Sequence, residues 1–392
     1  MIRINIPGFS TSDSGGPRWG DCTIIDDGTN YEIIDGYCGV GTSKLIKRMK
    51  FLKILTPYLY ISHAHYDHYK GIREIINYKD DDDKYVFTPK MLYCYDPESL
   101  RCSDVRNSRG YGYVKSEITN LSKIISEAKA RKIPVKFLKH GDHIKHGDID
   151  FYVYRKQPKT LYGDDDQGDA FLNDGSLCFW FPSLRYWTSG DGPEKIYDVC
   201  KSVGARPTVF KIPHHGNNCP ASQANGLKSL GALYCWDNDI STYYTDFLLY
   251  GRRRCVQAGI KYLNCIGDIN VIYFGTRAVI YKNGKIYRHS CSYAGKPALK
   301  GHTAAVVRKV MNGSYGAGDA RTTKLLDAGY NPGLVQKNVN QVISIAKGIL
   351  SGKMNYGKNQ ERIRKIDAEL GAGYGQLVQD YINVLCGVRK GV

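Results

Sequence analysis

The sequence predicts an α/β domain followed by a small helical region, and three observations support this prediction. Within residues 1–300, short apolar runs suited to buried strands end repeatedly in a ligand-type residue and a glycine. Beyond that point aromatic residues become fewer, glycine becomes more frequent, and apolar residues take a helical spacing. Two segments of this later region repeat at a spacing of about 40 residues. The 392 residues suffice for one large domain and a smaller one.

The strongest local signal follows the apolar run 58–61, which predicts a short buried strand. His63, His65, Asp67 and His68 come directly after it. We expect His63 and His65 to bind one metal ion, and Asp67 and His68 to bind a second. Imidazole nitrogen and carboxylate oxygen in a site open to water suit borderline ions such as zinc. A solvated histidine-rich loop is the alternative, and the position after a strand favours the metal site.

Further strand ends carry similar residues. Asp35 ends the strand 31–36, Asn173 and Asp174 precede the strand 177–181, Asp191 follows the strand 185–188, and His214 and His215 follow the strand 208–212. Repetition of this layout indicates that the ligand-type residues gather at one edge of the sheets. Gly71, shortly after the first cluster, predicts a turn into a helix that starts near Ile72.

Three further histidines, His140, His143 and His146, are weaker metal candidates. Glycine–aspartate pairs at 141–142 and 147–148 predict a tight connection between the strands 135–138 and 149–154. We therefore expect these three to be exposed hairpin side chains.

Composition narrows the choice of partners. The net charge of +17 and the pI of about 9.2 predict a polyanionic partner, for which nucleic acid, teichoic acid and a bacterial envelope all qualify. No apolar run approaches the roughly 18 residues that a membrane span needs. The N-terminus lacks a secretory signal, so any export is expected to use another route. The twelve cysteines include no C-x-x-C pair and are expected to be reduced and buried.

Five motifs occur in a fixed order along the first part of the chain. They are I-D-G at 34–36, H-x-H-x-D-H at 63–68, N-D-x-S-L at 173–177, T-S-G-D at 188–191 and P-H-H-G at 213–216. Together they resemble the metallo-β-lactamase superfamily over residues 1–300. Within it, they resemble the branch typified by the soluble domain of competence proteins and by the pneumococcal phosphorylcholine esterase. This resemblance implies an αββα sandwich with a two-metal site at one edge.

The resemblance also implies roles for individual residues. Two zinc ions, with manganese as the alternative, are the implied cofactors, and Asp35 is a structural residue beside their site. Site one takes His63 and His65, site two takes Asp67 and His68, and Asp191 bridges the two. One of His214 and His215 completes site two while the other faces substrate, and these two histidines and Asp67 are the candidate catalytic residues.

The third ligand of site one departs from the family pattern. Many members have a histidine where this chain has Asn173 and Asp174. An amide oxygen is a poorer zinc ligand than imidazole, and Asp174 is the alternative ligand, so both remain candidates.

The segment from Gly313 to Asn340 closely resembles the cell-wall-binding repeat of a pneumococcal phage lysozyme. This resemblance implies recognition of the peptidoglycan muropeptide. The matching polar and turn positions are Asp319, Arg321, Gly329 and Tyr330. A helical dimerisation or packing module is the alternative.

The repeat pattern predicts two units of three short helices with glycine breaks, residues 304–344 and 345–392. The second unit diverges at Lys358 and Gln360, which leaves its ligand site open.

Taken together, these features predict a dinuclear zinc-dependent hydrolase that acts on the bacterial cell wall, organised like a phage endolysin. It would be made in the cytoplasm and reach the wall through membrane holes made by a phage holin, or by non-classical export. A wall phosphodiester of the teichoic acid type and a peptidoglycan amide are the candidate bonds. A metal-dependent DNA phosphodiesterase is the first alternative, and a non-catalytic wall-binding protein on the same fold is the second.

Overall fold

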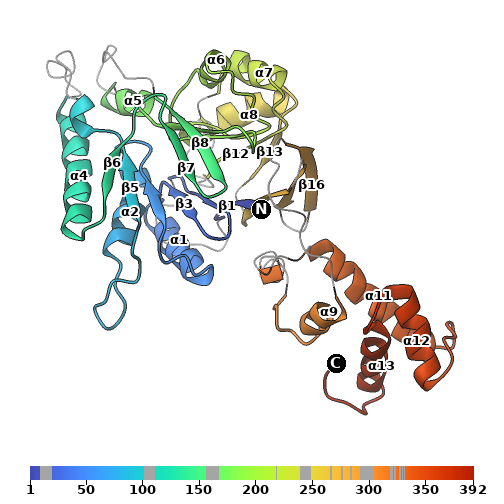
Figure 1. Ribbon diagram of the computed structural model, residues 1–392. Helices are drawn as coiled ribbons and strands as arrows, with labels where there is room; N and C mark the ends of the chain where they lie inside the picture. Colours follow the sequence, from blue (N-terminus) through green and yellow to red (C-terminus); the bar gives the residue numbers. More distant parts are fainter. Residues whose placement is uncertain are drawn as a thin grey trace. The chain divides into compact units, whose positions relative to one another are not determined.

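A computed structural model of the chain is shown in Figure 1. It describes residues 1–8, 20–100, 111–155, 167–217, 219–238, 249–264, 267–274, 277–282, 285–291, 303–317, 321, 324–325, 328, 330 and 332–392. Contacts divide the chain into two compact units, Met1–Pro297 and Ala298–Val392. Each unit has a hydrophobic core of its own.

Two mixed sheets form the centre of the first unit. In the described residues, one sheet has nine strands in the order β16-β15-β14-β1-β2-β3-β4-β5-β6, and the other has seven in the order β13-β12-β11-β10-β9-β8-β7. The strands of the first sheet are β1 (Ile2–Ile6), β2 (Thr23–Asp26), β3 (Tyr31–Ile34), β4 (Tyr58–Tyr60), β5 (Met91–Cys94), β6 (Val135–Phe137), β14 (Ile269–Phe274), β15 (Arg277–Lys282) and β16 (Lys285–Ser290). Those of the second are β7 (His143–His146), β8 (Ile149–Tyr154), β9 (Cys178–Phe181), β10 (Tyr186–Ser189), β11 (Val209–Lys211), β12 (Tyr234–Trp236) and β13 (Lys261–Leu263).

Helices cover the outer faces of both sheets (Figure 1). The nine-stranded sheet carries α1 (Val40–Phe51), α2 (Tyr66–Asn77) and α4 (Tyr111–Ala130), and the seven-stranded sheet carries α6 (Ile196–Ser202), α7 (Ala221–Ser229) and α8 (Leu249–Gln257). A short helix, α5 (Gln167–Asp174), and two 3₁₀ turns, η1 (Pro97–Leu100) and η2 (His214–Gly216), complete the unit among its described residues. This order of layers is the αββα sandwich predicted from the sequence.

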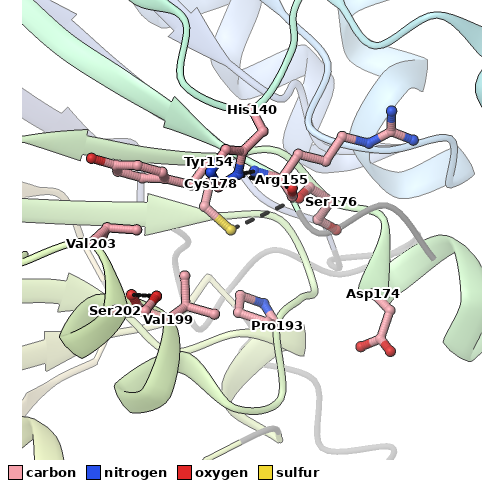
Figure 2. A pocket seen from close by; sticks show the side chains of 10 residues that line it. All are labelled: His140, Tyr154, Arg155, Asp174, Ser176, Cys178, Pro193, Val199, Ser202 and Val203. Atoms are coloured by element: carbon pink, nitrogen blue, oxygen red, sulfur yellow. Dashed lines mark hydrogen bonds between the residues drawn. The ribbon is translucent and has the colours of Figure 1, made fainter. Parts of the chain in front are cut away.

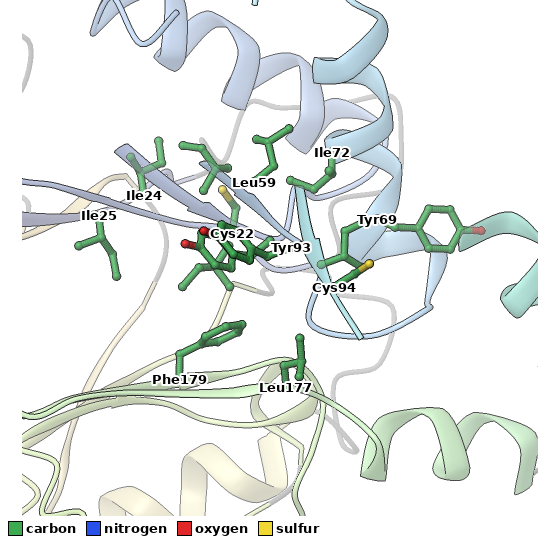
Figure 3. Packing of buried hydrophobic residues seen from close by; sticks show 14 of the residues in the cluster. Cys22, Ile24, Ile25, Leu59, Tyr69, Ile72, Tyr93, Cys94, Leu177 and Phe179 are labelled. Carbon is green, nitrogen blue, oxygen red and sulfur yellow. The ribbon is translucent and has the colours of Figure 1, made fainter. Parts of the chain in front are cut away.

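Strand β9 shows why its sequence is apolar throughout. Phe179 and Phe181 belong to the core between the two sheets, whereas Cys178 and Trp180 belong to the core beneath α6, α7 and α8. Successive side chains of a strand point to opposite faces, so a strand covered on both faces needs an unbroken apolar run. Figure 3 shows Phe179 facing the first sheet near Tyr93, while Ile72 lies on the helix side of that sheet.

Two local predictions were wrong. Helix α2 begins at Tyr66 instead of Ile72, and Gly71 lies inside it. A Cβ on Gly71 would come within 1.7 Å of the Gly36 carbonyl oxygen, so glycine permits close packing here and makes no turn. The expected tight connection at 141–148 also contains strand β7, which pairs with β8 in the second sheet.

His146 differs from the exposed hairpin side chain that was predicted. Its Nδ1 lies 2.9 Å from Oε1 of Glu32, and its ring stacks on Tyr58 at 3.6 Å between centroids. His143 does match the prediction: it is exposed, and its Nε2 lies 2.6 Å from Asp150. Among the cysteines that the structure describes, all are free and every one except Cys386 is buried.

The second unit is helical. Its described helices are α9 (Ala304–Met311), α11 (Pro332–Leu350), α12 (Asn359–Leu370) and α13 (Tyr374–Leu385). They pack around one apolar core that includes Val307, Val342 and Leu377. Helix α11 continues through residues 344 and 345, where the sequence predicted the boundary between repeats. In the described part of the chain, no helix is both long and apolar enough to cross a membrane.

Candidate metal centre

The predicted ligands come together because of strand direction. β3 and β4 are parallel in the first sheet, and β10 and β11 are parallel in the second. The segments that follow these strands therefore leave the sheets at corresponding edges. Asp35 follows β3, His63 and His65 follow β4, Asp67 and His68 lie on the first turn of α2, Asp191 follows β10, and His214 and His215 follow β11.

Asp191 lies at the centre of the cluster and is buried. Its Oδ1 is 3.2 Å from Nε2 of His68. Its Oδ2 is 3.4 Å from Nε2 of His215 and 3.7 Å from Nε2 of His63. One carboxylate thus faces histidines from both sheets.

Two groups of potential ligands share Asp191. The first comprises His63, His65 and Asp191, and the second comprises Asp21, His68, Asp191 and His215; within each group the ligand atoms lie within 4.8 Å of one another. Nε2 of His63 and Nδ1 of His65 are 2.9 Å apart, so both rings aim a nitrogen at the same point. Asp191 is common to both groups, the position expected of a bridging residue, whereas the second group contains Asp21 and not Asp67, which was expected there.

Asp35 determines which nitrogen two of the histidines present. Its Oδ2 lies 2.9 Å from Nδ1 of His68 and accepts a hydrogen bond of 2.7 Å from the Ser62 hydroxyl. Since Ser62 donates its only hydroxyl proton to Asp35, it accepts from Nδ1 of His63, 3.0 Å away. Nε2 of both rings is thereby directed at Asp191. A carboxylate in this outer position orients metal-binding histidines in general.

Close packing at Gly190 explains the glycine of the T-S-G-D motif. A Cβ at this position would come within 2.3 Å of the Ser62 hydroxyl oxygen and 2.6 Å of Nδ1 of His63. Any side chain here would displace the residues that orient His63.

His214 and His215 take different positions. His215 is buried and its Nε2 lies 2.9 Å from Oδ2 of Asp67, whereas the His214 side chain is 29% exposed and its Nε2 lies 4.0 Å from Asp191. Asp67 is 21% exposed and also lies 3.7 Å from Nε2 of His68. His215 therefore joins the second group, while Asp67 and His214 lie on its solvent side.

Asn173 and Asp174 end helix α5. The backbone carbonyl of Asn173 packs against Gly192, which is the residue after Asp191. The Asn173 side chain is buried. Asp174 belongs to neither ligand group among the described residues.

Asp174 instead lines a cavity of about 220 Å³ (Figure 2). Its other lining residues are His140, Tyr154, Arg155, Ser176, Cys178, Pro193, Val199, Ser202 and Val203. Ser176 connects this cavity to the segment of Asp191, because its hydroxyl accepts a 3.3 Å hydrogen bond from the Gly192 amide.

Sequence reasoning missed Asp21 and Lys211. Asp21 precedes β2, which is antiparallel to β3, so the start of β2 lies beside the end of β3. The Asp21 carbonyl accepts a hydrogen bond from the Tyr37 amide at 3.0 Å, which fixes this position. Recognition of the hairpin formed by 23–26 and 31–34 would have placed Asp21 near Asp35. For Lys211, the available signal was a lysine within the otherwise apolar strand 208–212, where a buried charge needs a partner.

The side chains at this centre fit divalent metal ions. Their nitrogen and carboxylate oxygen donors suit zinc or manganese. Nε2 of His68 and Oδ1 of Asp191 are buried and lie 3.2 Å apart, but their geometry does not form a hydrogen bond. Buried polar atoms need an interaction partner, and a cation bound between the imidazole nitrogen and the carboxylate oxygen would supply one for both.

The pKa values reflect the crowding of charge. Burial, followed by the neighbouring His68 and His65, holds the pKa of His63 well below its usual value, so this ring is neutral. Burial also acts to lower the pKa of His68, but the carboxylates of Asp191 and Asp67 outweigh it and raise that pKa well above its usual value. A divalent ion would replace the proton that these carboxylates attract.

In the second unit, Arg321 and Arg362 make equivalent contacts, one in each of the two segments that the sequence predicts to be repeats. Nε of Arg321 donates to the Gly316 carbonyl at 2.9 Å, and Nε of Arg362 donates to the Gly357 carbonyl at 3.1 Å. Nη1 of each arginine then donates to a glutamine, Gln336 at 2.9 Å and Gln379 at 3.0 Å, which in turn donates to Asn340 and Asn383. The divergence at Lys358 and Gln360 leaves this network intact.

Of the other predicted wall-binding positions, the structure describes Tyr330. Tyr330 packs against the core of the second unit. Asp319 and Gly329 lie outside the described residues.

Comparison with known proteins identifies one part of the chain. Residues 304–343 match the family model of the CW_7 repeat. A search of curated proteins found no relative that matches the chain.

Solved structures share only general features with the chain. The metallo-β-lactamase-fold protein YhfI from Bacillus subtilis is similar at 10% identity with a TM-score of 0.43, over 74% of this chain and 99% of that one. Unliganded yeast PDE1 is similar at 10% identity with a TM-score of 0.42, over 69% of this chain and 99% of that one. A diphosphatase of the PhnP family is similar at 12% identity with a TM-score of 0.39, over 70% of this chain and 98% of that one.

Proposed function

We propose that the protein is a dinuclear metal-dependent hydrolase that acts on the bacterial cell wall. The position of Asp191 supports this proposal most directly, because one buried carboxylate lies between two groups of histidine ligands. The match of residues 304–343 to the CW_7 repeat supports the cell wall as the target.

Each group of ligands would hold one divalent ion, zinc or manganese. His63, His65 and Asp191 would hold the first, and His68, His215 and Asp191 the second. Asp67, whose Oδ2 lies 2.9 Å from Nε2 of His215, is proposed as a further ligand of the second ion in place of Asp21. Two such ions, when bound, would polarise the bond under attack and lower the pKa of a water that serves as nucleophile.

The chain's own residues supply orientation and access. Asp35 and Ser62 hold Nε2 of His63 and His68 toward the centre, and the His214 imidazole is exposed on the solvent side. His214 is therefore placed to contact substrate and to transfer a proton to the leaving group. The Asp67 side chain is also partly exposed, and its Oδ2 lies 2.9 Å from Nε2 of His215.

The second unit would deliver the enzyme to its polymeric substrate. Its two copies hold an arginine in the same network, and this equivalence supports two wall-binding sites. Two linked sites on one polymer raise the overall affinity without any new contact. The muropeptide of peptidoglycan is the proposed ligand.

For the bond that is cut, we propose a phosphodiester of the teichoic acid type or an amide of the peptidoglycan stem. The net charge of +17 favours a polyanionic substrate, and hence the phosphodiester. Synthesis in the cytoplasm and action at the wall, after release by a phage holin or by non-classical export, complete the proposal.

Mass spectrometry of purified Gram-positive walls after incubation with the zinc-loaded protein tests this function. We expect soluble fragments with a new phosphate-bearing or amine-bearing end, and this end identifies the bond. Walls that remain intact would count against the proposal. A protein that sediments with walls but binds no metal would support a non-catalytic wall-binding protein.

The same positive charge supports a second candidate, a metal-dependent DNA phosphodiesterase. Binding to DNA alone cannot decide, because any polyanion attracts such a protein. Efficient cutting of duplex DNA at physiological salt, with inert walls under the same metal conditions, would make the nuclease the better assignment.

A further inference from the structure

Two buried histidines of the centre are held in the same way. His68 places Nδ1 2.9 Å from Asp35 and Nε2 3.2 Å from Asp191. His215 places Nδ1 3.4 Å from Oδ1 of Asp21 and Nε2 3.4 Å from Asp191. Each ring therefore has a carboxylate near its outer nitrogen and the shared carboxylate near its inner nitrogen. Oδ2 of Asp21 also lies 3.8 Å from Nδ1 of His68, beyond the closer Asp35. Asp21 thus takes a position beside His215 that corresponds to that of Asp35 beside His68, although its contact is longer than the Asp35–His68 hydrogen bond and is an ion pair only.

Lys211 explains how Asp21 is held in this outer position. Its ammonium group forms an ion pair with Oδ2 of Asp21 and donates a 2.7 Å hydrogen bond to the Gly190 carbonyl. It also lies 3.8 Å from Oδ1 of Asp191. Lys211 is completely buried, and a buried ammonium needs such partners to remain charged.

The two oxygens of Asp21 thus have different partners. Oδ2 pairs with Lys211, and Oδ1 faces the side of the His215 ring that points away from Asp67 and Asp191. An ion bound directly by Asp21 would compete with the fully buried Lys211 for the negative charge of this carboxylate. The ion pair therefore favours an outer role for Asp21, although its carboxylate lies within 4.8 Å of the ligand atoms.

We propose that Asp21 and Lys211 are positioning residues of the second metal site. Asp21 accepts the Nδ1 proton of His215 and leaves Nε2 free for the ion, and Lys211 keeps Asp21 in this outer position. The inference rests on the proposed function in one respect, namely that the centre holds two divalent ions.

Cobalt binding to the full-length protein tests this assignment. The variants are Asp21→Asn, Lys211→Met and the double variant, and the readouts are cobalt stoichiometry, stepwise affinity and the hyperfine-shifted imidazole N–H signals in proton NMR. The matched control is Glu32→Gln. Glu32 is also a buried carboxylate on Nδ1 of a histidine, His146, but it belongs to neither ligand group of the described residues.

We expect Asp21→Asn to retain two cobalt ions, to bind one of them about 10–100-fold more weakly, and to shift or lose one N–H signal. Lys211→Met should affect the same ion and the same signal. The double variant should be no weaker than Asp21→Asn alone, because the two residues act through one contact. Glu32→Gln should leave cobalt binding unchanged.

Two results would overturn the assignment while leaving the proposed function intact. A stoichiometry of one ion for Asp21→Asn would make Asp21 a direct ligand. Unchanged affinity and N–H signals in both single variants would remove any positioning role. Wild-type protein that binds no cobalt would overturn the two-metal function and, with it, this assignment.

Discussion

Nε2 of His68 lies 3.2 Å from Oδ1 of Asp191, and both side chains are buried. This contact joins a residue on the first turn of α2 to one that follows β10 in the other sheet. Because both residues are shielded from water, a charged His68–Asp191 pair is stable only if further hydrogen bonds or charges offset the cost of removing it from water.

Replacement of Asp191 by Ala should remove most metal from the protein. Both ligand groups lose their shared carboxylate, so we expect fewer than two ions per chain and activity lower by more than about 100-fold. Loss of a residue that only orients a metal ligand typically costs about 10–100-fold. Metal analysis and turnover measure these effects. His143→Ala is the control, because His143 is exposed and pairs with Asp150 away from the centre. Equal losses in the two variants would contradict the shared-ligand role.

His214 and His215 should separate metal binding from turnover. His215 is buried against Asp67 and Asp191, so His215→Ala should lower the metal content. The His214 side chain is 29% exposed, so His214→Ala should keep both ions and lose about 10²–10⁴-fold in turnover, the usual contribution of an acid or base. Metal loss in His214→Ala with full metal in His215→Ala would reverse the two roles.

The paired arginines of the second unit predict two equivalent wall-binding sites. Arg321→Met and Arg362→Met should each weaken sedimentation with peptidoglycan by about tenfold or more, and the double variant should abolish it. Lys353→Met removes the same charge at an exposed position and serves as the control. Normal binding by Arg362→Met would restrict wall recognition to the first copy.

Truncation should divide the two activities. Every proposed metal ligand precedes residue 300, and the contacts separate the units at Pro297. A chain ending near residue 300 should still cleave a small soluble phosphodiester, and residues 301–392 alone should sediment with peptidoglycan. Equal wall binding by the truncated and full-length proteins would remove the targeting role from the second unit.

Asp380 predicts a pH dependence of the second unit. It pairs with Arg308 of α9 at 2.6 Å and with Arg389 at 2.9 Å. Burial acts to raise its pKa, but the hydrogen bonds from Gln376 and Arg308 outweigh burial and lower the pKa below its usual value. A group with a lowered folded-state pKa stabilises the fold above its unfolded pKa, and this stabilisation is lost as the pH falls through the folded value.

Hydrogen exchange of α9 and α13 in the full-length protein should therefore become faster as the pH falls from about 5 to about 2, after correction for intrinsic exchange. Asp380→Asn should exchange faster at pH 5 and show a smaller change with pH. A wild-type profile as flat as that of the variant would show that the Asp380 pairs contribute nothing to stability.

Much of the centre was predictable because its ligands follow strand ends. His63, His65, Asp67 and His68 follow β4 within one short segment, and parallel pairing brings Asp191 and His215 to the same edge. Asp21 was not predictable in this way. It precedes an antiparallel strand, and its proximity to His215 depends on how the two sheets pack against each other.

The sequence by itself determined the helical nature of the second unit, which follows from the local periodicity of apolar residues. The αββα layers were implied by the resemblance of the five ordered motifs to a known superfamily. The sequence also determined which strand ends carry side chains of the ligand type. Only the tertiary structure decided that His215 and not His214 is buried, that Gly71 serves the contact of α2 with Gly36, and that Asp21 pairs with Lys211. The physical reason is that these relationships join segments far apart in the chain, and burial and close approach arise only when the sheets and helices pack together.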